Sequence, residues 1–285
     1  MKLDISYRGF LKSCNYACDY CPMAMQTETK EEKERDKKSL EEFVNWIGSN
    51  NNVQFRILFT PWGEALVRRW YREKVVELSH LEHVKQITVQ TNLSRDPSWL
   101  SEANLKKLTL WITYHPGQVL QEKFLLQLKK LDDMNVNYTV GMVGKEEFSE
   151  EIKTMRILIS KKRYFWINAY QSGRHQYPED LIETFAKIDP LFLLNYKTNS
   201  SQDKSCSAGE KSLFIDGFGN IKRCHFVDNK LSDIYDPNWK KTLKPRKCPN
   251  EMCNCYIGYI HLDELNIKNY YGKQKLARIP IEYHR

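Results

Sequence analysis

Short apolar runs alternate with amphipathic stretches along the first two thirds of the chain. Six runs rich in β-branched or aromatic residues have the length of strands: Leu3–Tyr7, Val53–Thr60, Gln86–Thr91, Thr109–Tyr114, Tyr138–Val143 and Phe165–Tyr170. The stretches between and after them have helical periodicity: Ser39–Ile47, Leu66–Leu78, Pro97–Asn104, Glu122–Met134, Glu150–Lys161 and Glu179–Ile188. Several follow or begin with a residue type that caps helix N-termini, namely Ser39, Asp96 and Ser149.

This alternation predicts an α/β fold with a parallel sheet and helices outside it. Six βα units are too few to close an eight-stranded barrel, so we expect an open, partial (β/α)6 TIM barrel over residues 1–195. After that point the pattern changes. Lys211–Asp216 and Ile221–Phe226 flank a glycine-bearing turn, which predicts a β-hairpin. We therefore expect a small second domain with a C-terminal tail over residues 196–285.

Charge and composition narrow the function. The 285 residues carry a formal net charge of +8, but basic and acidic residues are mixed, as in the run Thr29–Lys38. Without a single-sign stripe the sequence argues against a nucleic-acid partner, and the charge permits an acidic substrate. No apolar run approaches the roughly 20 residues of a membrane span, and the N-terminus does not resemble a secretory signal. We expect a cytoplasmic protein with no membrane association.

Eight cysteines in such a chain point to metal or redox chemistry, because the cytosol keeps thiols reduced. Three of them form the pattern C-x3-C-x2-C at Cys14, Cys18 and Cys21, with Tyr20 directly before the last. Three thiolates from one loop can hold a cubane whose fourth iron has no protein ligand. That iron is free to bind the amino and carboxyl groups of S-adenosylmethionine. A zinc knuckle or an ordinary four-cysteine cluster would need a fourth ligand close by.

The motif resembles the signature of the radical S-adenosylmethionine superfamily, CxxxCxxC with an aromatic residue before the third cysteine. The resemblance implies a catalytic [4Fe-4S] cluster on these cysteines, S-adenosylmethionine as cofactor, and an external one-electron donor of the flavodoxin or ferredoxin type. Residues 60–65 resemble the GGEP motif, which holds the cofactor's amino group. Gly63 and Glu64 match it, whereas Trp62 replaces the first glycine and Ala65 the proline.

Three further segments resemble cofactor-binding positions of the superfamily. Thr91 and Asn92 resemble the TNG segment, with Leu93 in place of the glycine. Val143 lies in a partial match to the GxIxGxxE motif, and Asn168 lies in the sixth strand, another adenine-contact region. The resemblance implies cofactor contacts for all of these and for Tyr20. A capped turn at Thr91 and a core strand at Asn168 are the alternatives.

The later cysteines resemble a known auxiliary pattern. Cys206, Gly219 and Cys224 form C-x12-G-x4-C, the spacing that opens SPASM and twitch domains, and Cys248, Cys253 and Cys255 follow. The count fits the twitch type, which implies a second, auxiliary [4Fe-4S] cluster. Five candidates for four positions leave one cysteine spare, or one site open to substrate. A structural zinc site is the alternative.

The resemblance implies an enzyme that cleaves S-adenosylmethionine reductively and abstracts a hydrogen atom from its substrate. One expected activity is modification of a ribosomally made peptide or protein. The alternative is oxidation of a small sugar-like or alcohol substrate. A non-enzymatic iron-sulfur electron carrier remains a third reading, although a carrier needs neither six βα units nor an open iron.

Overall fold

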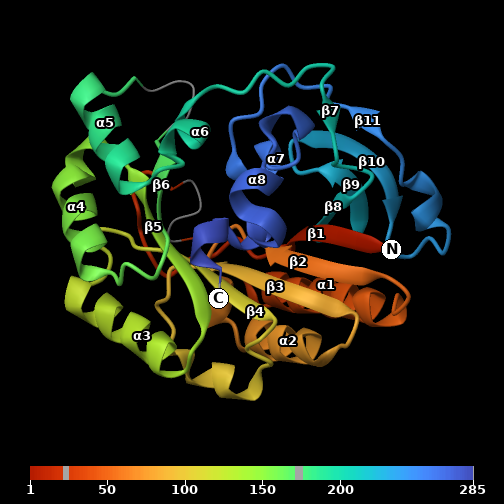
Figure 1. Cartoon of the computed structure of the whole chain (residues 1–285). Coiled ribbons are helices and arrows are strands. Elements are labelled where there is room, and N and C mark those ends of the chain that lie inside the picture. The colour runs from red at the N-terminus through yellow and green to blue at the C-terminus, as the bar shows by residue number, and fades with distance from the viewer. Residues whose placement is uncertain (22–25, 171–175, 285) are drawn as a thin grey trace.

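The computed structural model describes residues 1–21, 26–170 and 176–284. Its main feature is a nine-stranded sheet with the order β10-β9-β8-β1-β2-β3-β4-β5-β6 (Figure 1). The strands are β1 (Lys2–Arg8), β2 (Gln54–Phe59), β3 (Val84–Thr91), β4 (Leu108–Thr113), β5 (Asn137–Gly144), β6 (Phe165–Ala169), β8 (Ser212–Asp216), β9 (Asn220–Cys224) and β10 (Val227–Asp233). Strands β1 to β6 are parallel and lie in sequence order, which confirms the predicted α/β fold with a partial barrel.

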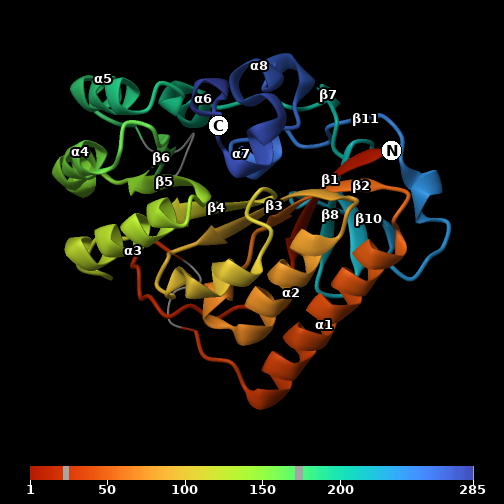
Figure 2. The same cartoon turned by 60° about the horizontal axis from the view of Figure 1, so that its bottom comes forward.

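Helices pack on the convex face of the sheet, as Figure 2 makes clear for α1, α2 and α3. They are α1 (Lys30–Ser49), α2 (Arg69–His80), α3 (Gln121–Asp133), α4 (Ser149–Leu158), α5 (Glu179–Ile188) and α6 (Phe192–Tyr196), with 3-10 turns η1 (Ala65–Val67), η2 (Pro97–Glu102) and η3 (Glu146–Phe148). Alternate strand residues such as Leu3, Ile5 and Tyr7 enter this outer core, because successive side chains point to opposite faces.

Two of the expected helices differ from the prediction, one in its start and one in its type. Helix α1 begins much earlier than Ser39, after a capping box in which Thr29 and Glu32 satisfy each other's backbone donors. Ser39 lies inside that helix, where its hydroxyl is 3.0 Å from the hydroxyl of Tyr7. The stretch Pro97–Asn104 forms only the turn η2, although Asp96 does cap it.

Ser149 is the third residue predicted to cap a helix. It belongs to helix α4 itself, and the N-cap position is Phe148, which makes no side-chain capping bond.

The predicted hairpin forms from β8 and β9, and Gly219 adopts a φ of +76° in its turn. Strand β8 also pairs in parallel with β1, so the hairpin extends the barrel sheet beyond its first strand. Nothing in this arrangement tests the division at residues 195 and 196, which stays a prediction.

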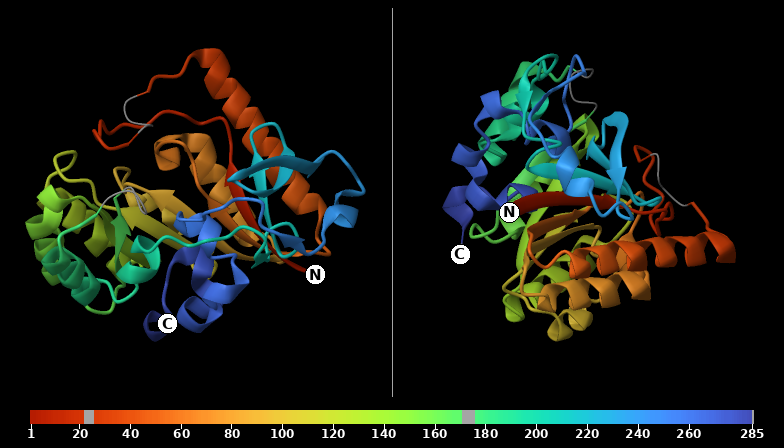
Figure 3. Two further views of the ribbon diagram at one scale, coloured as in Figure 1. Left: turned by 90° about the horizontal axis from the view of Figure 1, so that it is seen from above. Right: turned by 90° about the vertical axis from the view of Figure 1, so that its right-hand side faces the viewer.

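The C-terminal segment lies on the concave face of the sheet, which is visible in Figures 1 and 3. Its elements there are β7 (Ser205–Cys206), β11 (Arg246–Lys247), α7 (Tyr256–Tyr259), η5 (Asp263–Leu265), α8 (Lys268–Tyr271), η6 (Gly272–Ala277) and η7 (Ile281–Tyr283). The turn η4 (Trp239–Thr242) instead joins the outer core, where the rings of Trp239 and Trp46 of α1 are 4.9 Å apart. The inward-facing Leu58, Trp111 and Trp166 join tyrosines of this segment in a second, inner core. No helix among the described residues is long and apolar enough to cross a membrane.

Candidate functional site

The first three cysteines lie in the loop that follows β1, at the carboxyl end of the parallel strands. The loop after β2 packs directly on it. The amide of Glu64 donates to the carbonyl of Ser13 at 3.1 Å. A Cβ atom on Gly63 would lie 1.9 Å from that same carbonyl oxygen, so only glycine fits. Gly63 is thus the residue that lets the two loops touch.

The buried carboxylate of Glu28 holds the residues that lead into the cysteine loop. Glu28 accepts hydrogen bonds from the Lys12 amide at 3.0 Å and from the Ser13 hydroxyl. Arg68 forms an ion pair with Glu28 at 2.8 Å and also donates to the Ser13 hydroxyl at 2.6 Å. Sequence reasoning missed this clamp, because Glu28 and Arg68 belong to no motif and meet only in the fold.

Glu64, Thr91 and Asn92 lie together in one hydrogen-bond network, as expected of residues that share a site. The Glu64 carboxylate is 2% exposed and accepts three hydrogen bonds. Its Oε1 receives the Leu66 amide at 3.0 Å and the Thr91 hydroxyl at 2.8 Å, and its Oε2 receives the Asn92 amide at 2.5 Å. One lone pair of Oε2 is left for a further donor.

Burial dominates the protonation of this carboxyl. Loss of water raises the pKa of Glu64 to about 7, although the three hydrogen bonds oppose that rise. Asn92 also reaches the cysteine loop, where its side-chain amide lies 3.8 Å from the Cys14 sulfur and 3.1 Å from Asn15 Oδ1. The ends of β2 and β3 are therefore tied to the first cysteine.

The other two cysteines of the motif face aromatic and imidazole groups. Nδ1 of His115 lies 3.3 Å from the Cys18 sulfur and 2.8 Å from the Tyr20 hydroxyl. Tyr20 also stacks on the His115 ring, with 6.0 Å between centroids. Burial lowers the pKa of His115 to about 4, so the imidazole is neutral.

The donor set of this loop fits an iron-sulfur cluster. All three cysteines are free thiols. Burial raises the pKa of Cys18 to about 11, and the charges of Cys21 and Cys14 add to that rise. Among the described residues no three His, Cys, Asp or Glu side chains are arranged as ligands of one metal ion. The fit therefore rests on the number and type of the thiols and on their place in one loop.

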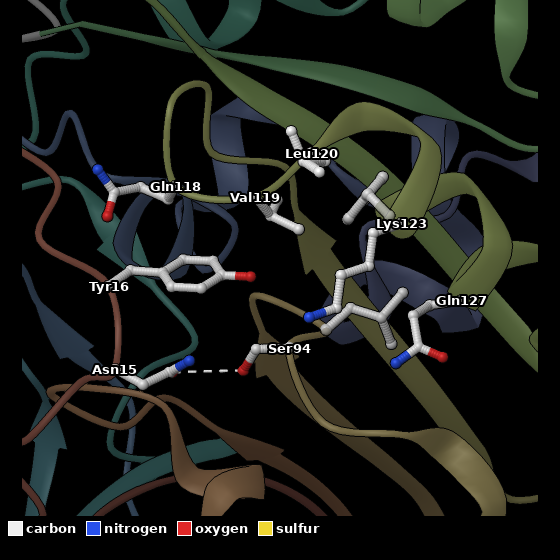
Figure 4. Close-up of a pocket in the computed structure, with 10 residues that line it drawn as sticks. Asn15, Tyr16, Ser94, Gln118, Val119, Leu120, Lys123 and Gln127 are labelled. Atoms are coloured by element: carbon white, nitrogen blue, oxygen red, sulfur yellow. Dashed lines mark hydrogen bonds between the residues drawn. The ribbon is translucent and has the colours of Figure 1, made fainter.

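A cavity of about 320 Å³ adjoins the same loop between the end of β3 and the start of α3. Figure 4 shows the Tyr16 hydroxyl and the Lys123 ammonium pointing into it, with Asn15 and Ser94 joined by a hydrogen bond. None of the predicted cofactor-binding residues lines this cavity. The cavity therefore lies next to the residues predicted to bind the cofactor but does not include them.

Val143 and Asn168 lie side by side in the register of β5 and β6. They are not in contact with the Glu64 network through any hydrogen bond in the described part of the chain. Asn168 Oδ1 instead accepts from Arg278 Nη1 at 3.4 Å. The guanidinium of Arg278 lies over the rings of Trp166 and Tyr256, at 4.5 and 4.6 Å.

Four of the five later cysteines form a second group. Burial raises the pKa of Cys224 to about 11, and the charges of Cys206 and Cys248 add to it. Burial also raises the pKa of Cys253, and the charges of Cys224, Cys248, Cys206 and Cys255 all add to that rise. All are free thiols. Pairing of β7 with β11 and a backbone bond from the Cys248 amide to the Lys204 carbonyl bring these segments together.

Cys255 differs from the other four in its exposure. It is exposed at the N-terminus of α7, whereas the other four are buried or half-buried. Burial raises the pKa of its thiol, and the nearby charges of Arg8 and Arg278 oppose this rise. Which of the five cysteines is spare stays a prediction.

Comparisons with known proteins give a fold and no sequence family. No family model matches the sequence, and no curated protein is similar to it. Among solved structures, native anSMEcpe with bound AdoMet and the Cp18Cys peptide has a TM-score of 0.56 at 15% identity, over 85% of this chain and 80% of that one. Streptococcus suis SuiB bound to S-adenosylmethionine has a TM-score of 0.57 at 14% identity, over 84% of this chain and 65% of that one.

Both structures were solved with S-adenosylmethionine bound. At such low identity the likeness concerns the fold alone. It extends over more than four fifths of this chain. The chain therefore shares the fold of these two structures, in agreement with the partial barrel that its sequence predicts.

Proposed function

We propose that this protein is a radical S-adenosylmethionine enzyme that modifies a peptide. The observation that carries the proposal is the convergence of Glu64, Thr91 and Asn92 on the loop that holds Cys14. Motifs far apart in the sequence thereby meet at one place, at the end of the barrel where catalytic groups of such folds lie. A structural iron-sulfur or zinc site would not need a buried carboxylate beside it.

Each residue has a distinct role in this proposal. Cys14, Cys18 and Cys21 hold a [4Fe-4S] cluster, and Glu64 receives the amino group of S-adenosylmethionine through its remaining lone pair. When bound, the cluster supplies the electron that cleaves S-adenosylmethionine and so starts radical chemistry on the substrate. Gly63 and Asn92 keep the carboxylate and the cysteine loop in register. Tyr20, Val143 and Asn168 are proposed to contact the adenosyl part.

We further propose that Cys206, Cys224, Cys248 and Cys253 hold an auxiliary [4Fe-4S] cluster. Arg223 supports this assignment, because its side chain is 6% exposed, donates to the Lys247 carbonyl and lowers the pKa of Cys206 against the effect of burial. A buried guanidinium offsets part of the negative charge that four thiolates bring.

The solved structures support the choice of a peptide as substrate. One of them, anSMEcpe, holds the Cp18Cys peptide together with AdoMet, in a fold that covers 85% of this chain. The small sugar-like or alcohol substrate has no comparable support. The net charge of +8 is consistent with an acidic peptide. An external flavodoxin or ferredoxin is the proposed electron donor.

The central test is cofactor cleavage by the anaerobically reconstituted protein with dithionite as reductant. We expect 5'-deoxyadenosine from the wild type and none from the triple variant in which Cys14, Cys18 and Cys21 are alanine. The triple variant should keep about four irons per chain, held by the later cysteines. Equal 5'-deoxyadenosine from both proteins would contradict the proposal, and one zinc without iron in the triple variant would contradict the auxiliary cluster.

A further inference from the structure

Four segments of the chain enclose the cavity of about 320 Å³ that adjoins the cysteine loop. They are the cysteine loop itself, the end of β3, the loop before α3 and the first turns of α3 (Figure 4). Leu120, which lines the cavity, is 76% exposed, and Lys123 is also exposed, so a molecule can enter from solvent. The volume lies at the lower end of the range for small-molecule sites.

Two hydrogen-bond donors point into this cavity without acceptors. Tyr16 is 8% exposed, and its hydroxyl points into the cavity (Figure 4), where no described residue forms a hydrogen bond with it. The Lys123 ammonium points into the same space, and Lys123 belongs to no ion pair among the described residues. An acceptor, preferably an anion, would satisfy both groups.

A buried acceptor without a partner lies one helical turn further along α3. Gln127 follows Lys123 by four positions and also lines the cavity, so both lie on the same face of the helix. Gln127 is 8% exposed, and its carbonyl oxygen Oε1 is buried without a hydrogen-bond partner. Such an acceptor destabilises the fold, and a ligand with an N–H or O–H group would remove that penalty.

The start of helix α3 adds positive potential to the same wall. Its N-cap residue is Leu120, which makes no side-chain capping bond, so the amides of the first turn lack a side-chain acceptor. The N-terminus of a helix carries partial positive charge. Glu122, the acidic residue of the first turn, is exposed and does not line the cavity. This wall therefore suits an anion.

The size of the charge and the remaining walls narrow the class of ligand. Leu93, Val119 and Phe124 give the cavity an apolar side, which suits an apolar body. The single ammonium of Lys123 matches the one negative charge of a monocarboxylate. A phosphate monoester carries nearly two charges and would be only partly neutralised.

Hydrogen bonds connect the cavity walls to the cysteine loop. The Ser94 hydroxyl donates to Asn15 Oδ1 at 3.3 Å, and Gln118 Oε1 accepts from the Ala17 amide at 2.7 Å. Asn15 and Ala17 lie between the first and second cysteines of the motif. A molecule in the cavity would therefore contact the cysteine loop from the side of α3.

We propose that this cavity binds a small monocarboxylic acid that has an apolar body and a hydrogen-bond donor. Its carboxylate accepts from Tyr16 and Lys123, and its donor reaches Gln127 Oε1. The site lies outside the residues predicted to bind S-adenosylmethionine. The proposal goes beyond the proposed function, because it holds whether or not the protein cleaves that cofactor.

Three related probes test each part of this ligand chemistry. 3-Hydroxybenzoate has the carboxylate, the apolar ring and a hydroxyl donor, benzoate lacks the hydroxyl, and 3-hydroxybenzamide lacks the charge. Their affinities are measured by calorimetry on the full-length protein with its clusters reconstituted anaerobically. We expect 3-hydroxybenzoate to bind most tightly, benzoate about threefold or more weaker, and 3-hydroxybenzamide about tenfold or more weaker.

Variants assign these differences to single residues. Lys123→Gln should weaken 3-hydroxybenzoate about tenfold and leave 3-hydroxybenzamide unchanged. Lys129→Gln is the matched control, because it removes the same charge from an exposed position of α3 outside the cavity, and it should change neither affinity. Tyr16→Phe should weaken both carboxylates several-fold.

Gln127→Leu tests the buried acceptor in two ways. It should remove the preference for 3-hydroxybenzoate over benzoate, because the hydroxyl then has no acceptor. Without ligand it should melt at the same temperature as the wild type or above it, since the unsatisfied oxygen is gone. A retained preference in Gln127→Leu would contradict the assignment of Gln127 to the ligand.

Other outcomes would overturn the site as a whole. These are no saturable binding of 3-hydroxybenzoate, an equal loss in Lys123→Gln and Lys129→Gln, or displacement of the probe by S-adenosylmethionine. Tighter binding of phenyl phosphate than of 3-hydroxybenzoate would contradict the choice of a carboxylate. Failure of the proposed function looks different: a protein that forms no 5'-deoxyadenosine yet binds the probes in the expected order would keep this site.

Discussion

Glu64 is a buried carboxyl group whose ionisation affects stability and, in the proposed function, cofactor binding. Its pKa of about 7 in the fold exceeds the ordinary value of 4.5. The folded protein therefore binds this proton more tightly than the unfolded chain does. The resulting stability is present below pH 4.5 and is lost as the pH rises to about 7.

The first prediction concerns that loss. In protein without cofactor, the melting temperature of Glu64→Gln relative to wild type should be higher at about pH 8 than at about pH 5, because glutamine never ionises. The amide nitrogen of glutamine cannot accept the hydrogen bond that one carboxylate oxygen receives, and that loss is the same at both pH values. Glu73→Gln, an exposed residue of α2, is the matched control and should give no such trend. A difference independent of pH would mean that Glu64 is not the titrating group.

The second prediction concerns the cofactor. An ammonium group needs the ionised carboxylate, so affinity for S-adenosylmethionine should fall by up to about tenfold per pH unit below about 7. Binding near that pH should release a proton. Calorimetry in two buffers of different ionisation enthalpy measures the release directly. Identical heats in both buffers, or a Glu64→Gln variant with wild-type affinity, would remove Glu64 from the amino-group site.

The third prediction separates two neighbouring cysteines. Cys253→Ser should lose the auxiliary iron and destabilise the protein, because a small region with little core depends on its metal for folding. Cys255→Ser, two positions away, should keep about four irons in addition to those of the first cluster. Iron analysis with thermal unfolding decides between them. The assignment fails if both variants lose the same amount of iron.

At the scale of elements, the loops after β1 and β2 act as one unit because they touch through Gly63. The fourth prediction is that Gly63→Ala prevents binding of the first cluster while leaving the auxiliary cluster in place, since the clash is with backbone and no side chain can yield. Gly48→Ala in α1 is the control, because a Cβ there meets nothing within 4 Å. It should be neutral or stabilising by up to about 1 kcal/mol. A normal iron content in Gly63→Ala would show that the loops can separate.

Periodicity predicts the regular elements well. The six barrel strands and the hairpin follow from β-branched and aromatic runs, and α5 has the predicted ends. The start of α1 was missed, because the charged run after Thr29 has few apolar positions, although its capping box was a readable signal. The amphipathic pattern of Pro97–Asn104 predicts a helix, yet this segment forms only the short turn η2 between two strands.

The motifs predicted that Cys14, Glu64, Thr91 and Asn92 lie close together in the fold. Each lies at the carboxyl end of a parallel strand, and these strand ends share one edge of a sheet. The clamp of Glu28 and Arg68 could not be predicted in this way. It depends on two loops meeting in space, and neither residue carries a local signal. The exposure of Cys255, which distinguishes it from the other four later cysteines, depends on the same long-range information.

At the scale of the whole molecule, the barrel sheet has two covered faces. The concave face is covered by residues after 195, including Tyr256 and Tyr259. Two contacts attach the turn η6 to the strands of this face. Lys275 pairs with Asp4 at 3.2 Å, and the Thr139 hydroxyl donates to the Ala277 carbonyl. The apolar side chains of that face would otherwise meet water.

The fifth prediction is that residues 1–195 alone do not form a stable barrel. Without the C-terminal segment, Leu58, Trp111 and Trp166 become exposed, and each large side chain forfeits about 1.5–3 kcal/mol of burial. Soluble expression and binding of a hydrophobic dye compare the fragment with the full chain. A cooperatively unfolding fragment 1–195 would show that the inner core is dispensable.

The pairing of β1 with β8 also has a consequence for synthesis on the ribosome. Of the barrel strands, β1 is translated first. Its neighbour β8 is translated only after the other five barrel strands. Until then one of its edges offers unpaired backbone groups, which is the geometry that favours association with other chains. Nascent chains stalled before Ser212 should therefore recruit chaperones or aggregate, and those released after the hairpin should not. Among the barrel strands, the one translated first is thus among the last to complete its pairing.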